Sequence, residues 1–202
     1  MSIYELKPRF QAMLRPTVVR LHAMGATANQ VTLATCAVSM ALGLGIYFSA
    51  TAWLPFVLIP LWMLLRMAFN AVDGMLAREH GQQTKLGAFL NELTDVASDA
   101  ALYLPFVLVP AFSGFWVGTV IVLAGLSEFA GALGPTVGAS RRYDGPMGKS
   151  DRAFVFGALG LYIGCFGPPP VWAGWLMPLL AIAIAWTVVN RIRRALDEAP
   201  KI

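Results

Sequence analysis

The sequence predicts an all-α membrane protein that crosses the bilayer six times. Of its 202 residues, 57% are hydrophobic and only 13% are charged, whereas soluble domains carry about 25% charged residues. Residues 21–65 and 153–190 contain no Asp, Glu, Lys or Arg, and residues 100–140 contain only Glu128. A helix crosses the hydrocarbon with about 20 apolar residues, so each stretch holds two passes. These features exclude a soluble globule, a disordered chain and a disulfide scaffold.

The N-terminal segment, residues 3–22, predicts an amphipathic helix that lies in the membrane interface. Apolar positions such as Leu6 and Phe10 alternate with basic positions such as Lys7 and Arg15. This pattern suits a helix that lies flat on the bilayer. The first ten residues have no apolar core of a signal peptide, so we expect no cleaved leader.

Helix breakers divide the three apolar stretches into six spans. Residues 49–51 separate the first pair, residues 110–114 the second pair, and Gly167 with the three prolines after it the third. Gly, Pro and Ser in such runs are typical of turns. We therefore expect one domain, residues 1–202, with transmembrane helices near residues 29–49, 53–77, 86–109, 115–139, 150–166 and 172–190.

Lys and Arg residues lie on one side of this six-span arrangement. Fourteen of the fifteen occur at the N-terminus, between residues 78 and 85, between 141 and 152, or between 191 and 201. The positive-inside rule places these clusters, and with them both termini, in the cytoplasm. The formal charge of +4 is thus accounted for by membrane orientation, and we expect no nucleic-acid partner.

Polar residues concentrate where the second and third predicted spans meet. Asn70 and Asp73 are three residues apart and share one helix face, while Asn91, Asp95 and Asp99 are four apart and form one stripe. The two spans are antiparallel neighbours, so these faces can converge just inside the membrane boundary. Polar groups at that depth are costly unless they bind something, and clustered oxygen ligands suit Mg²⁺ or Mn²⁺ bound to phosphates. The alternative is a polar network without a ligand.

This segment resembles the signature of the CDP-alcohol phosphotransferase family, D-x2-D-G-x2-A-R-x8-G-x3-D-x3-D. The matching positions are, in order, Asn70, Asp73, Gly74, Ala77, Arg78, Gly87, Asn91 and Asp95. The length and the predicted topology are also similar to those of small prokaryotic members. Residues 27–32, Thr-Ala-Asn-Gln-Val-Thr, resemble the family's entry to the first span, with Ala28 in place of a proline.

The chain departs from the signature at the first and third acidic positions, which are Asn70 and Asn91. The resemblance implies that the four positions hold divalent metal, often two ions, and that the last acid is the catalytic base. Asp73 and Asp95 are then the implied carboxylate ligands, Asn70 and Asn91 are neutral oxygen ligands, and Asp95 is also the base. Two ions would be poorly neutralised by two carboxylates, so one ion is an alternative to two. Asp99, one helical turn deeper, is a further candidate ligand.

The resemblance implies transfer of a phosphatidyl or other phospho-alcohol group from a CDP-alcohol to an acceptor hydroxyl, with release of CMP, in phospholipid biosynthesis. CDP-diacylglycerol is the expected donor and a bacterial inner membrane the expected location. A homodimer is also implied. Arg78 suits a phosphate because a guanidinium can bind it with two parallel hydrogen bonds. The implied CDP contacts are Thr27, Asn29, Thr32, Gly74, Ala77, Arg78 and Gly87.

The loop before the fifth predicted span carries four basic residues beside the expected site: Arg141, Arg142, Lys149 and Arg152. A phosphate loop is excluded, because its first glycine would fall at Tyr143. The four bases could bind a phosphate on the acceptor, which would then be a phosphorylated polyol. Alternatively, they serve as cytoplasmic anchors that contact lipid headgroups.

Arg66 and Glu128 are the remaining charges within predicted spans. Each would be costly alone in the membrane, so we expect them to form a structural ion pair. The alternative is that Arg66 reaches a substrate phosphate.

Two further functions stay open. The asparagines also fit a catalytically inactive protein that binds a CDP-lipid, which would bind CDP without releasing CMP. A small transporter could use Asp73, Asp95 and Arg66 as an ion path, but the spacing of the signature does not favour it.

Overall fold

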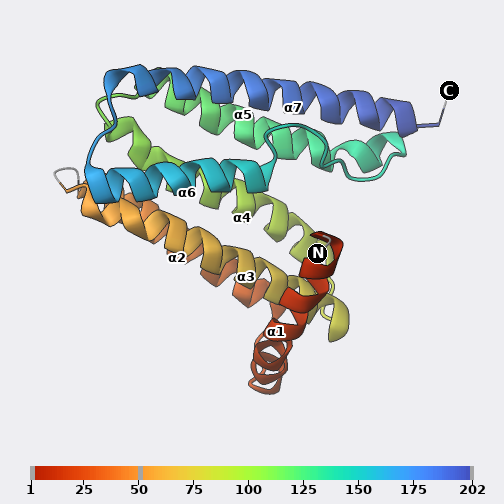
Figure 1. Ribbon diagram of the computed structural model, residues 1–202. Coiled ribbons are helices and arrows are strands. Elements are labelled where there is room, and N and C mark those ends of the chain that lie inside the picture. The colour runs from red at the N-terminus through yellow and green to blue at the C-terminus, as the bar shows by residue number, and fades with distance from the viewer. Residues whose placement is uncertain (1–2, 50–51, 201–202) are drawn as a thin grey trace.

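The computed structural model describes the backbone of residues 3–49 and 52–200, and side chains from Phe10 onward within these ranges. These residues form seven α-helices, joined in part by short 3₁₀ helices (Figure 1). The α-helices are α1 (Ile3–Ala23), α2 (Ala28–Phe48), α3 (Leu58–Glu79), α4 (Lys85–Tyr103), α5 (Gly114–Ala132), α6 (Lys149–Phe166) and α7 (Leu176–Glu198). The 3₁₀ helices are η1 (Leu54–Val57), η2 (Leu104–Leu108), η3 (Gly134–Val137) and η4 (Val171–Trp175).

Four helical segments of the described chain are long and apolar enough to cross a membrane. They are Ala28–Phe48, Leu54–Glu79, Gly114–Ala132 and Val171–Glu198. The helices α4 and α6 fall outside this set because both carry several ionisable residues: Lys85, Glu92, Asp95 and Asp99 in α4, and Lys149, Asp151 and Arg152 in α6. The all-helical membrane fold is confirmed, and the prediction of six spans is supported for four of them.

Two predicted spans differ from the observed helices at one end. Helix α5 stops at Ala132, before the predicted end of the span 115–139, and the chain turns back through η3. There the Arg142 amide donates to the Gly131 carbonyl at 3.1 Å, which docks the following loop on the end of α5. Helix α7 continues to Glu198, beyond the predicted end of the span 172–190. Glu198 pairs there with Arg142 of the same loop.

Aromatic side chains close the apolar end of the bundle. Tyr103 of α4 stacks on Phe156 of α6, with ring centroids 3.8 Å apart. Phe106 meets Phe156 and Phe56 edge to face, at 5.0 and 5.4 Å, a geometry that aromatic pairs prefer. All four side chains are buried, so they hold η1, η2, α4 and α6 together along one end of the molecule.

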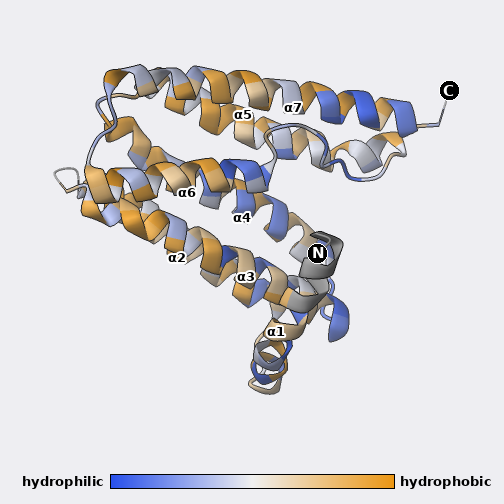
Figure 2. Ribbon diagram, viewed as in Figure 1, coloured by the Kyte–Doolittle hydropathy of each residue, from blue (hydrophilic) through white to orange (hydrophobic). Residues whose placement is uncertain are grey.

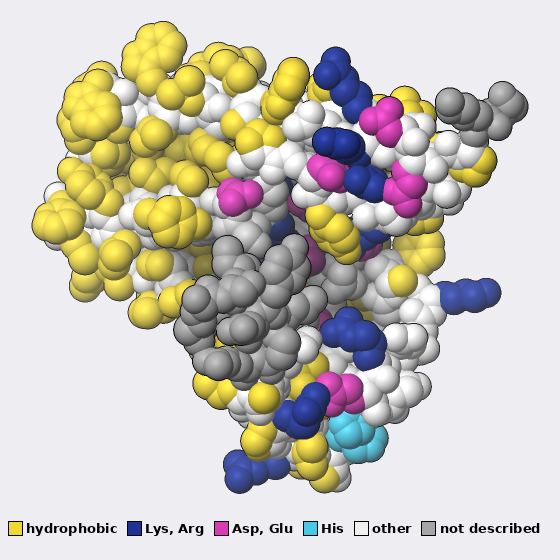
Figure 3. Space-filling view, turned by 45° about the vertical axis from the view of Figure 1, so that its right-hand side comes forward, with side chains coloured by type: hydrophobic (Ala, Val, Ile, Leu, Met, Phe, Trp, Pro, Cys, Tyr) yellow, Lys and Arg dark blue, Asp and Glu magenta, His cyan; other side chains and the backbone are white. Residues whose placement is uncertain are grey.

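Polar residues gather at the opposite end of the bundle. Figure 2 shows hydrophilic residues at the starts of α4 and α6 and at the end of α7. Basic and acidic side chains crowd the same end in the space-filling view, while the rest of that face is hydrophobic (Figure 3). Helix α1 packs beside this end, where buried Val18 contacts Leu76 and Arg15 lies 3.0 Å from Glu79. The charges thus lie at one end, as the positive-inside argument requires.

Candidate active site

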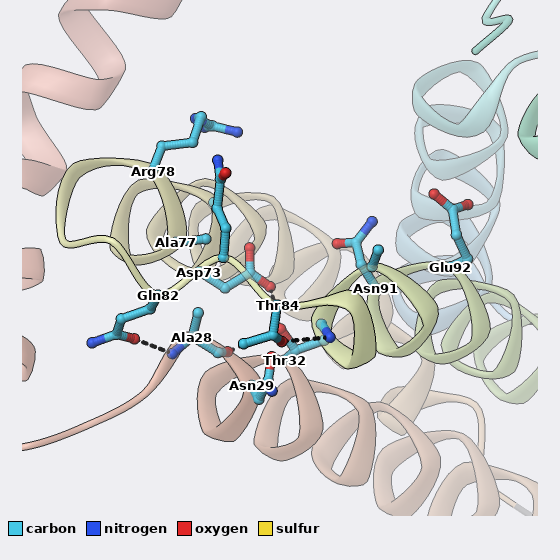
Figure 4. A pocket seen from close by; sticks show the side chains of 14 residues that line it. Ala28, Asn29, Thr32, Asp73, Ala77, Arg78, Gln82, Thr84, Asn91 and Glu92 are labelled. Atoms are coloured by element: carbon cyan, nitrogen blue, oxygen red, sulfur yellow. Dashed lines mark hydrogen bonds between the residues drawn. The ribbon is translucent and has the colours of Figure 1, made fainter. Parts of the chain in front are cut away.

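A cavity of about 430 Å³ opens at the polar end, where the start of α2, the end of α3 and the start of α4 meet (Figure 4). Six of the predicted nucleotide contacts line it: Asn29, Thr32, Gly74, Ala77, Arg78 and Gly87. The predicted metal ligands Asp73 and Asn91 line it as well. The cavity therefore brings six positions of the signature, from α3 and α4, together with Asn29 and Thr32 of α2. Asn70 and Asp95 do not line it.

The start of α2 is held by a capping box. The Thr27 side chain accepts a hydrogen bond from the Gln30 amide, and the Gln30 side chain accepts one from the Thr27 amide, which satisfies two free donors at the helix start. The next amide, of Ala28, donates to Gln82 Oε1 at 2.7 Å. Thr27, predicted to contact the nucleotide, thus serves as a helix cap at the cavity's edge, while Gln82 ties the α3–α4 loop to α2.

The start of α4 forms the second wall. Thr84 Oγ1 accepts a hydrogen bond from the Gly87 amide at 2.8 Å and so caps this helix. A Cβ atom at Gly87 would lie only 2.8 Å from Asn29 Oδ1 and 3.0 Å from Thr84 Oγ1. The glycine therefore lets α4 approach the start of α2, and it keeps Asn29 beside the cavity.

Asp73 and Asn91 place oxygen ligands on the cavity from α3 and α4. Asp73 is buried, and its Oδ2 accepts a hydrogen bond from the Thr32 hydroxyl at 2.7 Å. This bond orients the carboxylate toward the space between the helices (Figure 4). Arg78 stands on the same helix one turn later, at the rim.

Asp95, the predicted base, lies one turn beyond Asn91 and is held by three neighbours. Its Oδ1 is 3.0 Å from Arg66 Nη2, and its Oδ2 is 2.5 Å from Lys149 Nζ. The Asn70 amide nitrogen lies 3.5 Å from Oδ1. These contacts bring α3 and the start of α6 to Asp95 and fix the orientation of its carboxylate.

The predicted pair of Arg66 with Glu128 is wrong. In the described part of the chain, Arg66 pairs instead with Asp95 and Asp99, both on α4. The reason is packing, since α3 presents Arg66 to α4, whereas Glu128 on α5 faces α6 and α7. Asp99 also approaches Arg152, at 3.4 Å, and is buried. Its carboxylate is thus paired with two guanidinium groups, and its role as a further metal ligand stays a prediction.

The four bases predicted to bind an acceptor phosphate all have carboxylate partners. Lys149 pairs with Asp95, and Arg141 pairs with Glu92 on the cavity wall. Arg152 is buried and pairs with Asp99 and Glu128.

Arg142 lies farther out, where it pairs with Asp144 and Glu198. The hydrogen bonds from Arg142 hold the pKa of Asp144 below its usual range. Arg142 thereby organises the loop between α5 and α6 and the end of α7.

Several residues of the site were not predicted. Gln82, Gln83, Thr84 and Glu92 line the cavity. The spacing of Thr84 and Gly87 before an apolar helix is the signal that could have shown the cap. Arg191, predicted only as part of a cytoplasmic cluster, is buried and contacts Glu128 at 3.3 Å. No short-range pattern marks that contact, since the two residues are far apart in the sequence.

The oxygen donors at the cavity fit one hard divalent cation. Within the described ranges, no group of three or more His, Cys, Asp or Glu side chains is placed to hold a metal. Asp73 and Asn91 line the cavity, and Asn70 and Asp95 lie beside them. Mg²⁺ is commonly held by one or two carboxylates together with substrate phosphates and water. This donor set therefore suits an ion that a diphosphate helps to bind.

Comparison with known proteins decides the family. The profile of the CDP-alcohol phosphatidyltransferase family matches residues 25–189. The chain belongs to this family. It is accordingly a membrane transferase of phospholipid biosynthesis that takes its donor group from a CDP-alcohol. Among the functions that the sequence left open, the match selects the enzyme over the inactive binding protein and the transporter.

Two curated relatives cover nearly the whole chain. The inner membrane protein YnbA of Escherichia coli (strain K12) is 45% identical over 205 residues, covering all of both chains. The archaetidylinositol phosphate synthase of Aeropyrum pernix is 30% identical over 197 residues, covering 93% of this chain and 92% of its own. Both alignments include every residue range that forms the cavity walls.

Solved structures of one enzyme share the fold. The phosphatidylinositol phosphate synthase of Mycobacterium tuberculosis with CDP-DAG bound superposes with a TM-score of 0.73 at 24% identity, covering 89% of this chain and 92% of that one. The same enzyme in complex with manganese and citrate gives a TM-score of 0.73 at 24% identity, covering 90% and 88%. The helical bundle of α1–α7 is thus the architecture of a known phosphatidyltransferase.

Proposed function

We propose that the protein transfers a phosphatidyl group from CDP-diacylglycerol to the hydroxyl of an alcohol and releases CMP. The observation that carries this proposal is the cavity itself, in which eight residues of the family signature and of the α2 start face one space beside Asp95. A cavity of about 430 Å³ is within the range of small-ligand sites, about 300–1,000 Å³. The setting we propose is a bacterial inner membrane, with the site and both termini in the cytoplasm and two copies forming a homodimer.

The position of the cavity supports a lipid-linked donor. It lies at the polar end of the bundle, next to helices whose outer faces carry exposed apolar side chains such as Leu33, Leu86 and Phe89. A nucleotide can therefore sit among polar groups while its diacylglycerol extends along the apolar surface. A bound CDP-DAG in the Mycobacterium tuberculosis enzyme is in line with this choice of donor.

The proposed reaction is a displacement at the phosphorus that carries the lipid. The acceptor oxygen forms a bond to this phosphorus, the bond to the CMP oxygen breaks, and CMP leaves with the electron pair. Asp95 takes the proton of the acceptor hydroxyl as general base. Arg66 and Lys149 orient Asp95, and Arg78 binds a phosphate of the donor.

A divalent ion, Mg²⁺ or Mn²⁺, supplies charge neutralisation for the diphosphate when bound. Asp73 and Asp95 would hold it, with Asn70 and Asn91 as neutral oxygen ligands. The two asparagines favour one ion over two, because only two of the four ligand positions of the signature are carboxylates.

The proposal is tested with purified protein, CDP-diacylglycerol, divalent metal and a panel of alcohols. We expect CMP and a new phospholipid to form together, and both to disappear on chelation with EDTA and return with Mg²⁺ or Mn²⁺. Asp73→Ala and Asp95→Ala should each reduce the rate by about a hundredfold or more, as expected for loss of a metal ligand or base. Asp197→Ala, near the end of α7, is the matched control. Activity that survives both site substitutions would contradict the proposal.

A further inference from the structure

A buried carboxylate lies at the centre of three arginines beside the candidate site. Glu128 Oε1 is 2.8 Å from Arg152 Nη2, and Glu128 Oε2 is 3.3 Å from Arg191 Nη1 and 3.6 Å from Arg141 Nη2. The side chains of Glu128, Arg152 and Arg191 are only 7%, 1% and 2% exposed. We call Glu128 with these three arginines the arginine cluster; it joins α5, α6, α7 and the loop between α5 and α6.

The arginine cluster adjoins the cavity. Glu92 lines the cavity and pairs with Arg141. Arg152 reaches Asp99, which lies one helical turn from Asp95. The cluster therefore lies close to Asp95, the proposed base for the acceptor hydroxyl.

Each arginine of the cluster contacts at least one carboxylate. Glu92 pairs with Arg141, and Asp99 pairs with Arg152 and also with Arg66. Glu128 is the one carboxylate that all three arginines of the cluster contact. The position at which three convergent guanidinium groups would bind a phosphate is thus taken by a carboxylate of the protein itself.

A substrate phosphate would meet Glu128 at close range. Three convergent guanidinium groups suit a phosphate in shape and charge, but here the central position is taken by a carboxylate. Like charges repel strongly in a buried environment. Displacing Glu128 would instead leave a buried carboxylate without its partners, which is also strongly unfavourable.

We propose that Glu128 takes the place of a substrate phosphate in the arginine cluster, so that the acceptor is an alcohol without a phosphate group. This inference rests on the proposed function and reverses the phosphorylated polyol predicted from the sequence. Within the described residues, the Nε atoms of Arg141, Arg152 and Arg191 have no acceptor. These Nε atoms are buried within the cluster. An alcohol hydroxyl carries no charge that Glu128 would repel.

The first test measures anion binding without turnover. Inorganic phosphate and glycerol 3-phosphate are titrated against the full-length protein in micelles, with binding followed by equilibrium dialysis. We expect no saturable binding to the wild type at millimolar concentrations. The dissociation constant of Glu128→Gln should be at least about tenfold lower than that of the wild type, because one negative charge is removed from the cluster. Glu198→Gln, which alters a carboxylate that pairs with Arg142 outside the cluster, should match the wild type. Saturable wild-type binding that Glu128→Gln does not tighten would overturn the inference.

The second test compares acceptors in pairs, glycerol with glycerol 3-phosphate and inositol with inositol phosphate, in the CMP-release assay. We expect the wild type to use the unphosphorylated member with a kcat/KM at least about tenfold higher, and Glu128→Gln to move the ratio toward the phosphorylated member. A wild-type preference for the phosphorylated member of either pair would refute the inference. The wild-type measurements decide the question even where the variant does not fold.

The two proposals fail in different ways. If no alcohol of either kind yields CMP, the proposed function is refuted, while the binding titration still decides the role of Glu128. If phosphorylated acceptors are used efficiently, the transferase function stands and the role of Glu128 is refuted.

Discussion

At the scale of single residues, the two asparagines of the signature change the charge of the site. Asn70 directs its amide nitrogen toward Asp95 Oδ1 at 3.5 Å. A carboxylate at position 70 would face Asp95 with a like charge, whereas an amide can donate to it. Asp95 is paired with Arg66 and Lys149, so the site carries less negative charge than a fully acidic signature would.

Replacement of Thr32 by valine tests how Asp73 is positioned. The Thr32 hydroxyl donates to Asp73 Oδ2 at 2.7 Å, and valine keeps the shape but removes the donor. A buried carboxylate that loses one hydrogen bond loses about 1–3 kcal/mol, so we expect kcat/KM to fall about five- to hundredfold. Thr35→Val is the control, because the Thr35 hydroxyl bonds the Val31 carbonyl of its own helix. Equal activity of Thr32→Val and the wild type would show that this bond does not position Asp73.

At the scale of elements, close contact between α2 and α4 determines the width of the cavity. A Cβ atom at Gly43 would collide with the Ala101 carbonyl, so the two backbones meet here. Small residues at such points allow helices to approach closely in membranes. Helix α4 carries Asn91 and Asp95 toward α3, so its contact with α2 decides where these groups lie relative to Asp73.

Alanine substitutions at two glycines of α2 test this contact. Gly43→Ala should destabilise the protein by about 1–3 kcal/mol, as overpacking does, and should lower activity because α4 moves. For Gly45→Ala, no described atom lies within 4 Å of the added Cβ, so its melting temperature should match the wild type. Thermal unfolding in micelles, followed by tryptophan fluorescence, compares the two. Equal melting temperatures of the two variants would show that the close contact at Gly43 does not contribute to stability.

At the scale of the whole molecule, ion pairs run from Asp95 to Arg191 across five helices. Arg66 links α3 to α4, Asp99 and Arg152 link α4 to α6, and Glu128 links α5 to α6 and α7. The chain of charges lies at the polar end, while aromatic packing holds the other end. The polar end is therefore held by electrostatics, and its basic residues predict that this end faces the cytoplasm.

Cysteine labelling tests this orientation. In a variant that lacks Cys36 and Cys165, single cysteines are placed at Ser113, at the start of α5, and at Ser150, at the start of α6; both positions are exposed. With a membrane-impermeant maleimide and intact spheroplasts, we expect labelling of Ser113→Cys at once and of Ser150→Cys only after lysis. Labelling of both positions before lysis would contradict six spans with a cytoplasmic site.

The sequence by itself determined the membrane class, the helices and the polar segment from Asn70 to Asp95. These properties depend on local pattern: long apolar runs predict helices that cross a bilayer, and spacings of three or four residues place side chains on one face whatever that face meets. The signature also identified six residues of the cavity wall, including Asp73, Asn91 and Gly87.

Only the tertiary structure decided which partners these faces meet. Helical periodicity orients Arg66 and Glu128 but does not say which neighbouring helix each one faces, so the predicted pair was wrong and the three arginines around Glu128 were not foreseen. Contacts between residues 24 to 64 positions apart depend on how the helices pack. In this protein, that packing places Glu128 at the centre of bases that the sequence left apparently free, and this difference decides which acceptor we expect.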